Sequence, residues 1–358
     1  MTNLRRRRVL FGGAAISAGA LLTACTSNNS SDNTQTNTSD QTGANAAAGT
    51  KVVAGRNAEP GEKVTIGFSA PAADHGWIAA ITNNAKAQAA TYSDVTFNAV
   101  AAGKDVPEQR AALETLIQQK PDVIVLLPHD GAQMTATGRR AMDAGIPVIN
   151  LDREFSEPLA YRTLIKGDNY GMGVAAGNLI GQRLKGNPGA VIAEIAGIDE
   201  LPLTQDRSKG FKDALQTHGL RVSNRVAAKF TVQSGQEVTT NLLQAAPKID
   251  AIWNHDDDQG VGVLAAIKQA ARSEFYMVGG AGSLDAMELI KADSSPLKAT
   301  VTYSPTMASS AIALARLVAQ SKGMEDLIEL QVPKLIILQS ETITKDNVDR
   351  YMPLGFRS

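Results

Sequence analysis

Short apolar runs alternate with amphipathic stretches from about residue 63 onward. In the first half of the chain the apolar runs cover 64–68, 95–100, 122–127 and 147–150. The amphipathic stretches between them cover 77–91, 106–119 and 132–144. Continuous apolar strands separated by helices of about 10–15 residues are typical of a parallel sheet covered on both faces. The pattern therefore predicts an α/β unit.

The same alternation then repeats. The expected helices of the second half cover 170–184, 207–218, 236–245, 261–271, 284–291 and 306–320. The expected strands cover 190–195, 222–229, 249–253, 276–279, 299–302 and 335–338. Two successive units of this kind predict two doubly wound parallel-sheet lobes joined by a hinge, with a ligand bound outside the carboxyl ends of the strands. We expect one lobe at 62–167 plus about 304–335 and the other at 168–303 plus about 336–358.

The N-terminal segment has the features of an export signal. Arg5 to Arg8 form a basic start, and the apolar stretch 9–21 is too short for a permanent membrane helix. A small residue, Ala24, then directly precedes Cys25, which resembles a bacterial lipobox. The resemblance implies a lipoprotein signal peptide at 1–24 and an acyl anchor on Cys25 that holds the protein at the cell membrane. Both Sec and twin-arginine export fit the signal; the competing interpretation is a cytosolic protein with a basic arm.

Residues 26–60 are rich in Ser, Asn, Thr, Asp, Gln, Gly and Ala and contain almost no large apolar residues. Such a segment cannot bury enough surface to offset the entropy of ordering. We therefore expect a disordered tether at 25–61.

Composition limits the remaining possibilities. Cys25 is the only cysteine among 358 residues, so a disulfide or a cysteine-based site in the globular part is excluded. The formal net charge is −1, and removing the four arginines of the signal would leave about −5. This mild acidity argues against nucleic acid as a partner. The length left after the tether suits two cores.

Polar and aromatic residues collect where the predicted strands end. Ser69 ends the first strand, the pair Asp152 and Arg153 follows the fourth, and Asp256 and Tyr303 follow later ones. Charged side chains make short, strong hydrogen bonds to hydroxyl groups, and aromatic faces pack on C–H surfaces. These residue types favour a hydroxyl-rich ligand.

Several motifs, in this order and spacing, resemble type I periplasmic binding proteins of the ribose-binding-like branch of sugar importers. The motifs are Ile66-Gly67-Phe68-Ser69 with Trp77 eight residues after the serine, Pro147-Val148-Ile149-Asn150-Leu151-Asp152-Arg153, Gly167-Asp168-Asn169 at the inter-lobe hinge, and Asp206-Arg207-Ser208-Lys209-Gly210-Phe211. The resemblance covers about 63–345, nearly the whole folded part.

The resemblance implies a solute-binding protein of an ABC importer that closes on a monosaccharide or sugar alcohol and delivers it to a membrane permease. It implies no cofactor and no metal, and we expect a monomer. Nine ligand contacts carry over from the family: Ser69, His75 and Trp77 on one wall, Asp152 and Arg153 on adjacent hydroxyls, Arg207 from the other lobe, Phe230 stacked on the sugar, Asp256 in place of an asparagine and Tyr303 in place of a glutamine.

One position departs from the family. After the strand Met277-Val278-Gly279-Gly280 the family commonly has an acid, whereas this chain has Ala281. The loss of that acceptor and the gain of Asp256 change the hydrogen-bonding pattern. We therefore expect a ligand other than ribose, such as an acyclic polyol.

Structural interpretations compete at several of these residues. Trp77 and Phe230 also suit a hydrophobic core, and Arg207 also suits a structural role. We expect Asp256 to face the ligand, and Asp257 and Asp258 to form a solvated turn or helix start. None of the four histidines has metal-site spacing; His255, beside three aspartates, is the one candidate.

Two other functions remain as alternatives, and a third is disfavoured. A sensory receptor, or a binder of a sugar-like signal molecule, would use the same two lobes. A secreted glycosidase would use two acids such as Asp152 and Asp256. A cytosolic sugar-responsive repressor would need a DNA-binding helix-turn-helix at the N-terminus, where this chain has the predicted signal and tether.

Overall fold

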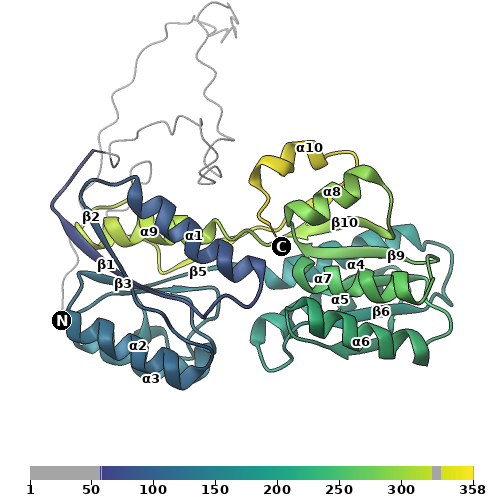
Figure 1. Cartoon of the computed structure of the whole chain (residues 1–358), viewed down its shortest axis with the longest axis horizontal. Coiled ribbons are helices and arrows are strands. Elements are labelled where there is room, and N and C mark those ends of the chain that lie inside the picture. Colours follow the sequence, from purple (N-terminus) through teal and green to yellow (C-terminus); the bar gives the residue numbers. More distant parts are fainter. Residues whose placement is uncertain (1–56, 58, 325–331, 358) are drawn as a thin grey trace, which may run out of the picture. The chain divides into compact units, whose positions relative to one another are not determined.

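The computed structural model describes residues 57, 59–324 and 332–357 (Figure 1). The predicted signal peptide 1–24, Cys25 and most of the predicted tether lie outside the described residues. The described chain alternates strands and helices and builds two sheets of six strands each. No described helix is both long enough and apolar enough to span a membrane.

The first sheet has the order β11-β5-β4-β3-β1-β2, and all its strands are parallel. Its strands are β1 (Val64–Ser69), β2 (Val95–Ala99), β3 (Val123–Leu126), β4 (Val148–Leu151), β5 (Thr163–Gly167) and β11 (Leu335–Leu338). With the helices α1 (Gly76–Ala90), α2 (Val106–Gln119), α3 (Gly131–Asp143) and α9 (Met307–Ala319), it forms the first lobe.

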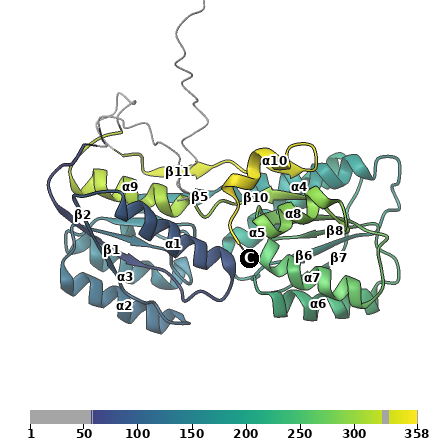
Figure 2. The same cartoon turned by 45° about the horizontal axis from the view of Figure 1, so that its top comes forward.

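Strand alternation explains how both faces of this sheet are covered. In β3, Val123 and Val125 belong to the core that α1 and α9 build, whereas Ile124 and Leu126 belong to the core under α2 and α3. Successive side chains of a strand point to opposite faces, so an unbroken apolar run serves two helical layers. Figures 1 and 2 show the two helix pairs on opposite faces.

The second sheet has the order β12-β10-β9-β8-β6-β7, with β12 antiparallel to β10. Its strands are β6 (Ile192–Ala196), β7 (Val222–Ala227), β8 (Ala251–Asn254), β9 (Tyr276–Ala281), β10 (Leu297–Thr302) and β12 (Thr342–Thr344). The second lobe adds α4 (Asn169–Arg183), α5 (Pro202–Thr217), α6 (Val232–Ala245), α7 (Asp257–Gln269), α8 (Leu284–Ala292) and the short α10 (Val348–Tyr351).

The two sheets share one topology. Without β11 and β12, each sheet has its first five strands in the order 2-1-3-4-5. In such doubly wound sheets the strand order reverses between the first and third strands, and ligands bind outside the carboxyl ends there. The predicted fold class, two doubly wound parallel-sheet lobes, is confirmed.

The chain passes between the lobes three times, after β5, after β10 and after β11. Hydrogen bonds hold these crossings together: Asp168 N donates to Leu338 O (2.9 Å) and Thr302 N donates to Glu341 O (2.8 Å). The return into the second lobe therefore follows Leu338. The boundary was expected at about residue 336; in the structure β11, which ends at Leu338, pairs with β5 of the first sheet.

Two strands, the short helix α10 and three helix starts differ from the sequence-based prediction; one of these starts is that of α5, which begins at Pro202 and not at residue 207. The strands β5 and β12 were not predicted, since β5 contains only two large apolar residues and β12 has only three residues. The helices α6 and α7 begin four residues earlier than predicted. Their caps explain the difference: Thr231 Oγ1 accepts from Ser234 N (3.4 Å), and the Asp256 side chain caps α7.

Candidate functional site

The carboxyl ends of the strands carry most of the predicted site. Ser69 is the last residue of β1, Asp152 directly follows β4, Asp256 lies just beyond β8 and Tyr303 directly follows β10. Asp152 has a φ of 64°, in the left-handed region that residues other than glycine rarely adopt. Backbone strain of this kind is often found at binding sites, where the surrounding structure holds it in place.

Tyr303 lies at the centre of the cluster and is 5% exposed. Its hydroxyl donates to Asp152 Oδ1 and accepts from Asn169 Nδ2 (3.2 Å). Its ring centroid is 5.7 Å from that of Trp77, and the Arg207 guanidinium lies 4.4 Å from it. Burial and the negative charge of Asp152 raise the pKa of Tyr303, so the phenol stays protonated and can donate.

Gly167 of the hinge motif leaves room for the ring of Tyr303. A Cβ atom on Gly167 would lie 2.1 Å from Tyr303 Cε2, so only glycine allows the ring to pack there. Asn169 joins the site as well, because its Oδ1 accepts from Arg207 Nε (2.8 Å). Asn169 was predicted only as part of the hinge; its position directly after the crossing from β5 was the signal for a second role.

Arg153 is held by the loop that follows β3. Its Nη1 donates to His129 O (2.7 Å) and Pro128 O (3.3 Å). Its Nε lies 3.9 Å from Asp152 Oδ2. Within the described part of the chain, this Nε and the Ser69 hydroxyl are both buried without a hydrogen-bond partner. Buried polar atoms are rarely left unpaired, so both atoms suit contacts with a polar ligand.

Arg207 comes from α5 of the second lobe and is 4% exposed. Its Nη1 donates to the His255 carbonyl oxygen (3.0 Å), and its guanidinium lies 5.9 Å from the Phe230 ring centroid. Together with its contacts to Asn169 and Tyr303, these interactions fix the guanidinium against residues of the site. Arg207 and Tyr303 therefore connect Trp77 of the first lobe to the second lobe.

His75 and Phe230 meet from opposite lobes, with their ring centroids 6.2 Å apart. His75 Nδ1 lies 2.5 Å from Asp74 Oδ1. Burial would lower the pKa of His75, but the Asp74 bond and the charges of Asp256 and Asp258 more than offset burial and raise it. This raised pKa favours the charged form of His75 opposite acids of the second lobe.

The three consecutive aspartates differ from their predicted arrangement. Asp256 is the cap: its Oδ1 accepts from Asp258 N (2.9 Å) and Gln259 N (3.3 Å). Asp257 and Asp258 were expected in a solvated turn or at a helix start: they do lie in the first turn of α7, but the solvated turn is wrong, because they are only 4% and 1% exposed. Asp257 accepts from backbone N–H groups at the end of β9 and just after it, and Asp258 Oδ2 accepts from Trp77 N (3.0 Å). The start of α7 is therefore buried.

Ala281, at the departure from the family pattern, lies at the end of β9 and is 4% exposed. Its φ of 96° lies far outside the usual range for alanine. The neighbouring N–H groups of Gly280 and Gly282 donate to the Asp257 carboxylate at 2.9 and 2.8 Å, which fixes the backbone in this conformation. This end of β9 thus presents a methyl group and no acceptor side chain.

Asp256 should respond to pH. Burial and the charge of Asp258 raise the pKa of Asp256 to about 6. The native chain must therefore ionise a buried carboxyl above pH 6, while the unfolded chain ionises it near pH 4. Because the native state holds the extra proton between these values, the group costs stability as pH rises through that window. We expect Asp256→Asn to raise the free energy of unfolding by about 1–3 kcal/mol at pH 7.5.

This gain should nearly vanish near pH 3.5, where the Asp256 carboxyl is mostly protonated in both the native and the unfolded state. Asparagine also remains a good cap, so the comparison isolates the charge. Urea titrations of both proteins at the two pH values measure it, with Asp105→Asn, a change at the exposed cap of α2, as the control. An equal gain at both pH values would contradict the assignment of the cost to ionisation.

His255, whose carbonyl oxygen accepts from Arg207, belongs to a buried hydrogen-bonded cluster. His255 Nδ1 accepts from Gly197 N (3.4 Å), so Nε2 carries the proton and donates to Glu194 Oε1 (3.1 Å). Ser208 also donates to this oxygen. Burial lowers the pKa of His255 to about 4 against the opposing effect of Glu194, so the imidazole is neutral at pH 7. No group of three or more metal-ligating side chains occurs among the described residues.

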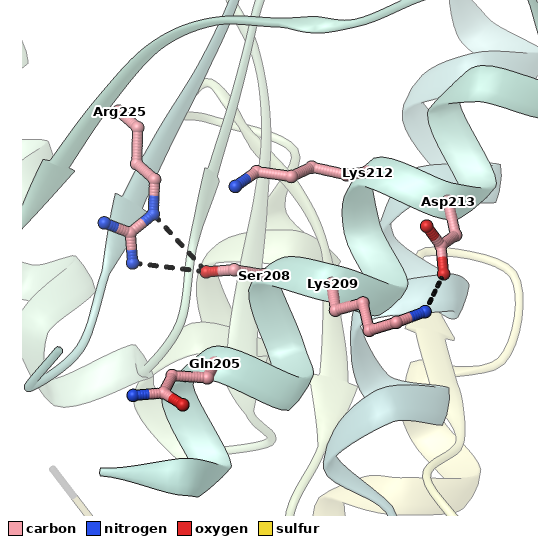
Figure 3. Close-up of a pocket in the computed structure, with 6 residues that line it drawn as sticks. All are labelled: Gln205, Ser208, Lys209, Lys212, Asp213 and Arg225. Atoms are coloured by element: carbon pink, nitrogen blue, oxygen red, sulfur yellow. Dashed lines mark hydrogen bonds and ion pairs between the residues drawn. The ribbon is translucent and has the colours of Figure 1, made fainter. Parts of the chain in front are cut away.

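A surface pocket of about 350 Å³ lies on the second lobe, apart from the predicted site residues (Figure 3). Its lining residues are Gln205, Ser208, Lys209, Lys212, Asp213 and Arg225. Lys209 Nζ pairs with Asp213 Oδ2 at 2.5 Å, and Arg225 pairs with Asp199 outside the pocket. Acids thus compensate much of its positive charge, and none of its lining residues belongs to the predicted site.

Comparisons with known proteins agree with this geometry. A family model described as a periplasmic binding protein domain matches residues 66–323. The ribose import binding protein RbsB of Bacillus subtilis is 32% identical over 208 residues, which cover 58% of this chain. The chain spans 66% of that relative's length, just under two thirds.

Solved structures match over more of the chain. A protein from Mycobacterium smegmatis in complex with β-D-fucofuranose is 25% identical with a TM-score of 0.73, and the match covers 81% of this chain and 94% of that one. An ABC transporter solute-binding protein from Bacillus halodurans with bound myo-inositol is 23% identical with a TM-score of 0.73, covering 81% and 98%, and this likeness shows the fold. Because the family model matches residues 66–323, most of this chain, the chain belongs to the periplasmic binding protein family.

Proposed function

We propose that this chain is the extracytoplasmic solute-binding lipoprotein of an ABC importer, which binds a monosaccharide or sugar alcohol between its two lobes and delivers it to a membrane permease. One observation carries the proposal. Asp152 of the first lobe and Arg207 of the second both contact Tyr303, at the carboxyl ends of their sheets. A ligand at this point would touch both lobes, so its binding would favour their closure.

The side chains suit hydroxyl groups on a carbon skeleton. Asp152 offers acceptor oxygens next to the unpaired Nε of Arg153, so neighbouring hydroxyls could donate to one residue and accept from the other. Trp77 and Phe230 supply aromatic faces for C–H surfaces. The names of the relatives, which mention ribose, fucofuranose and myo-inositol, support the same ligand class.

The preferred compound should differ from ribose. Ala281 brings no acceptor to the end of β9, and the nearby Asp257 carboxylate is occupied by backbone N–H groups. A furanose with another hydroxyl arrangement, a cyclitol or an acyclic polyol meets this pattern.

Binding without catalysis is part of the proposal. Asp152 receives a hydrogen bond from Tyr303 and faces Arg153, an arrangement that suits an acceptor for ligand hydroxyls. The relatives are named as binding proteins. Unchanged ligand recovered after prolonged incubation would agree with binding alone, whereas turnover would favour the secreted-enzyme alternative.

Location and assembly complete the proposal. An acyl chain on Cys25 would anchor the protein to the outer face of the cell membrane. Residues 26–60 would tether the lobes within reach of the permease. The protein would act as a monomer, with no nucleic-acid partner and no cofactor.

Calorimetric titration with D-ribose, D-galactose, myo-inositol and D-mannitol tests the ligand class. We expect saturable one-to-one binding of at least one compound, and weaker binding of ribose than of the best compound. The best compound should also raise the melting temperature as its concentration exceeds Kd, because it binds the native state alone. If ribose binds most tightly, the ligand preference is wrong; if none binds, the proposed function is wrong.

A further inference from the structure

The helix α1 begins without a cap of its own. Its N-cap residue, His75, makes no side-chain hydrogen bond to the helix, and the first turn contains no acidic residue. The first N–H groups of a helix lack intrahelical partners and carry a partial positive charge. The start of α1 therefore favours an acceptor, and preferably an anion, from elsewhere.

Asp258 supplies this acceptor from the opposite lobe. Its Oδ2 accepts from Trp77 N at 3.0 Å, and the residue is 1% exposed. Asp258 lies in the first turn of α7, whose own cap is Asp256. One carboxylate thus lies at the start of two helices, one from each lobe, and its charge strengthens both interactions.

Trp77 is bound to the second lobe a second time. Its indole Nε1 donates to Tyr303 O at 2.8 Å, and Tyr303 N in turn donates to Ala281 O at the end of β9. The backbone and the side chain of one residue are therefore held by two different elements of the second lobe. Separating the lobes would break the hydrogen bond between Asp258 and Trp77.

We propose that Asp258 is a positioning residue for ligand binding: by capping α1 from the second lobe, it holds Trp77 in place and keeps the lobes closed over the ligand. The inference rests on the proposed function for its ligand. The cap forms only when the lobes meet, which they do for part of the time without a ligand, whereas a ligand enters while they are apart. Asp258 should therefore slow dissociation and leave association largely unchanged.

Stopped-flow kinetics of Asp258→Ala in the full chain test this, with the tightest-binding compound of the four-member panel as probe. We expect the dissociation rate to rise about tenfold, as for the loss of one hydrogen bond to a charged group, with the association rate within about twofold. Asp258→Asn keeps an acceptor oxygen but loses the charge, so it should recover part of the slow dissociation.

Asp105→Ala is the matched control. Asp105 caps α2 within the first lobe, where its side chain accepts from Glu108 N at 2.8 Å. Its loss should lower the melting temperature without changing dissociation, which separates a purely structural cap from one that joins the lobes. A dissociation rate of Asp258→Ala within twofold of the unmodified protein would overturn the inference.

A ligand-free measurement keeps the inference separate from the proposed function. If no compound of the panel binds, the proposed function fails, and small-angle X-ray scattering of the ligand-free proteins decides the role of Asp258. We then expect a larger radius of gyration for Asp258→Ala than for the unmodified protein, with Asp105→Ala unchanged. Superimposable scattering curves would contradict the inference.

Discussion

Replacing Asp152 with alanine should weaken ligand binding by about 2–4 kcal/mol, the cost of removing one partner of a buried, charged hydrogen-bonding group. The change removes the acceptor for ligand hydroxyls, takes away the acceptor of the Tyr303 hydroxyl and removes the carboxylate beside Arg153. Calorimetry with the tightest-binding compound of the panel measures the loss. Asp152→Asn, which still accepts from Tyr303, should lose less.

Asp122→Ala is the control for this substitution. Asp122 lies on the same sheet but before β3, at the amino ends of the strands, where its carboxylate accepts from Thr65 N at 2.7 Å. It should leave affinity unchanged. Near-normal affinity of Asp152→Ala would remove Asp152 from the site and with it the proposed acceptor for the ligand.

Replacing Arg207 with alanine should have a comparable effect, about 2–4 kcal/mol in affinity, because two buried hydrogen-bond partners lose their donor. The side chain of Asn169 and the carbonyl of His255 would both be left without the arginine. Arg207→Lys keeps the charge but cannot make both hydrogen bonds with the same fork geometry, so it should recover only part of the affinity.

Arg221→Ala, at an exposed arginine just before β7, is the matched control and should bind normally. Because Arg207 also supports its neighbours, thermal melting must show that Arg207→Ala is folded at the temperature of the titration. A folded Arg207→Ala protein with unchanged affinity would place the ligand away from the second lobe.

The sequence was most informative where a pattern extends over a whole element. Apolar runs such as Val123–Leu126 are buried on both faces, and this double burial made the parallel sheets predictable. The strands β5 and β12 escaped prediction because pairing with distant segments, rather than local composition, defines them. The membership of β11 in the first lobe likewise depends on a partner about 170 residues away in the chain.

The candidate site likewise contains residues that the sequence could place and residues whose contacts it could not predict. Strand ends located Ser69, Asp152, Asp256 and Tyr303, because a strand's carboxyl end is fixed by its own residues. The roles of Asp257 and Asp258 could not be predicted in this way. Their partners, Gly280 and Trp77, come close only after the sheet and the lobes have formed. Local patterns therefore predict where a side chain lies more reliably than which distant group it contacts.

The most direct test of the central claim is a crystal structure of the protein with the tightest-binding compound of the panel. We predict that the compound lies between the lobes, with hydroxyl groups within hydrogen-bond distance of both Asp152 and Arg207 and with Trp77 against its carbon skeleton. A compound bound elsewhere, or touching one lobe alone, would contradict the account.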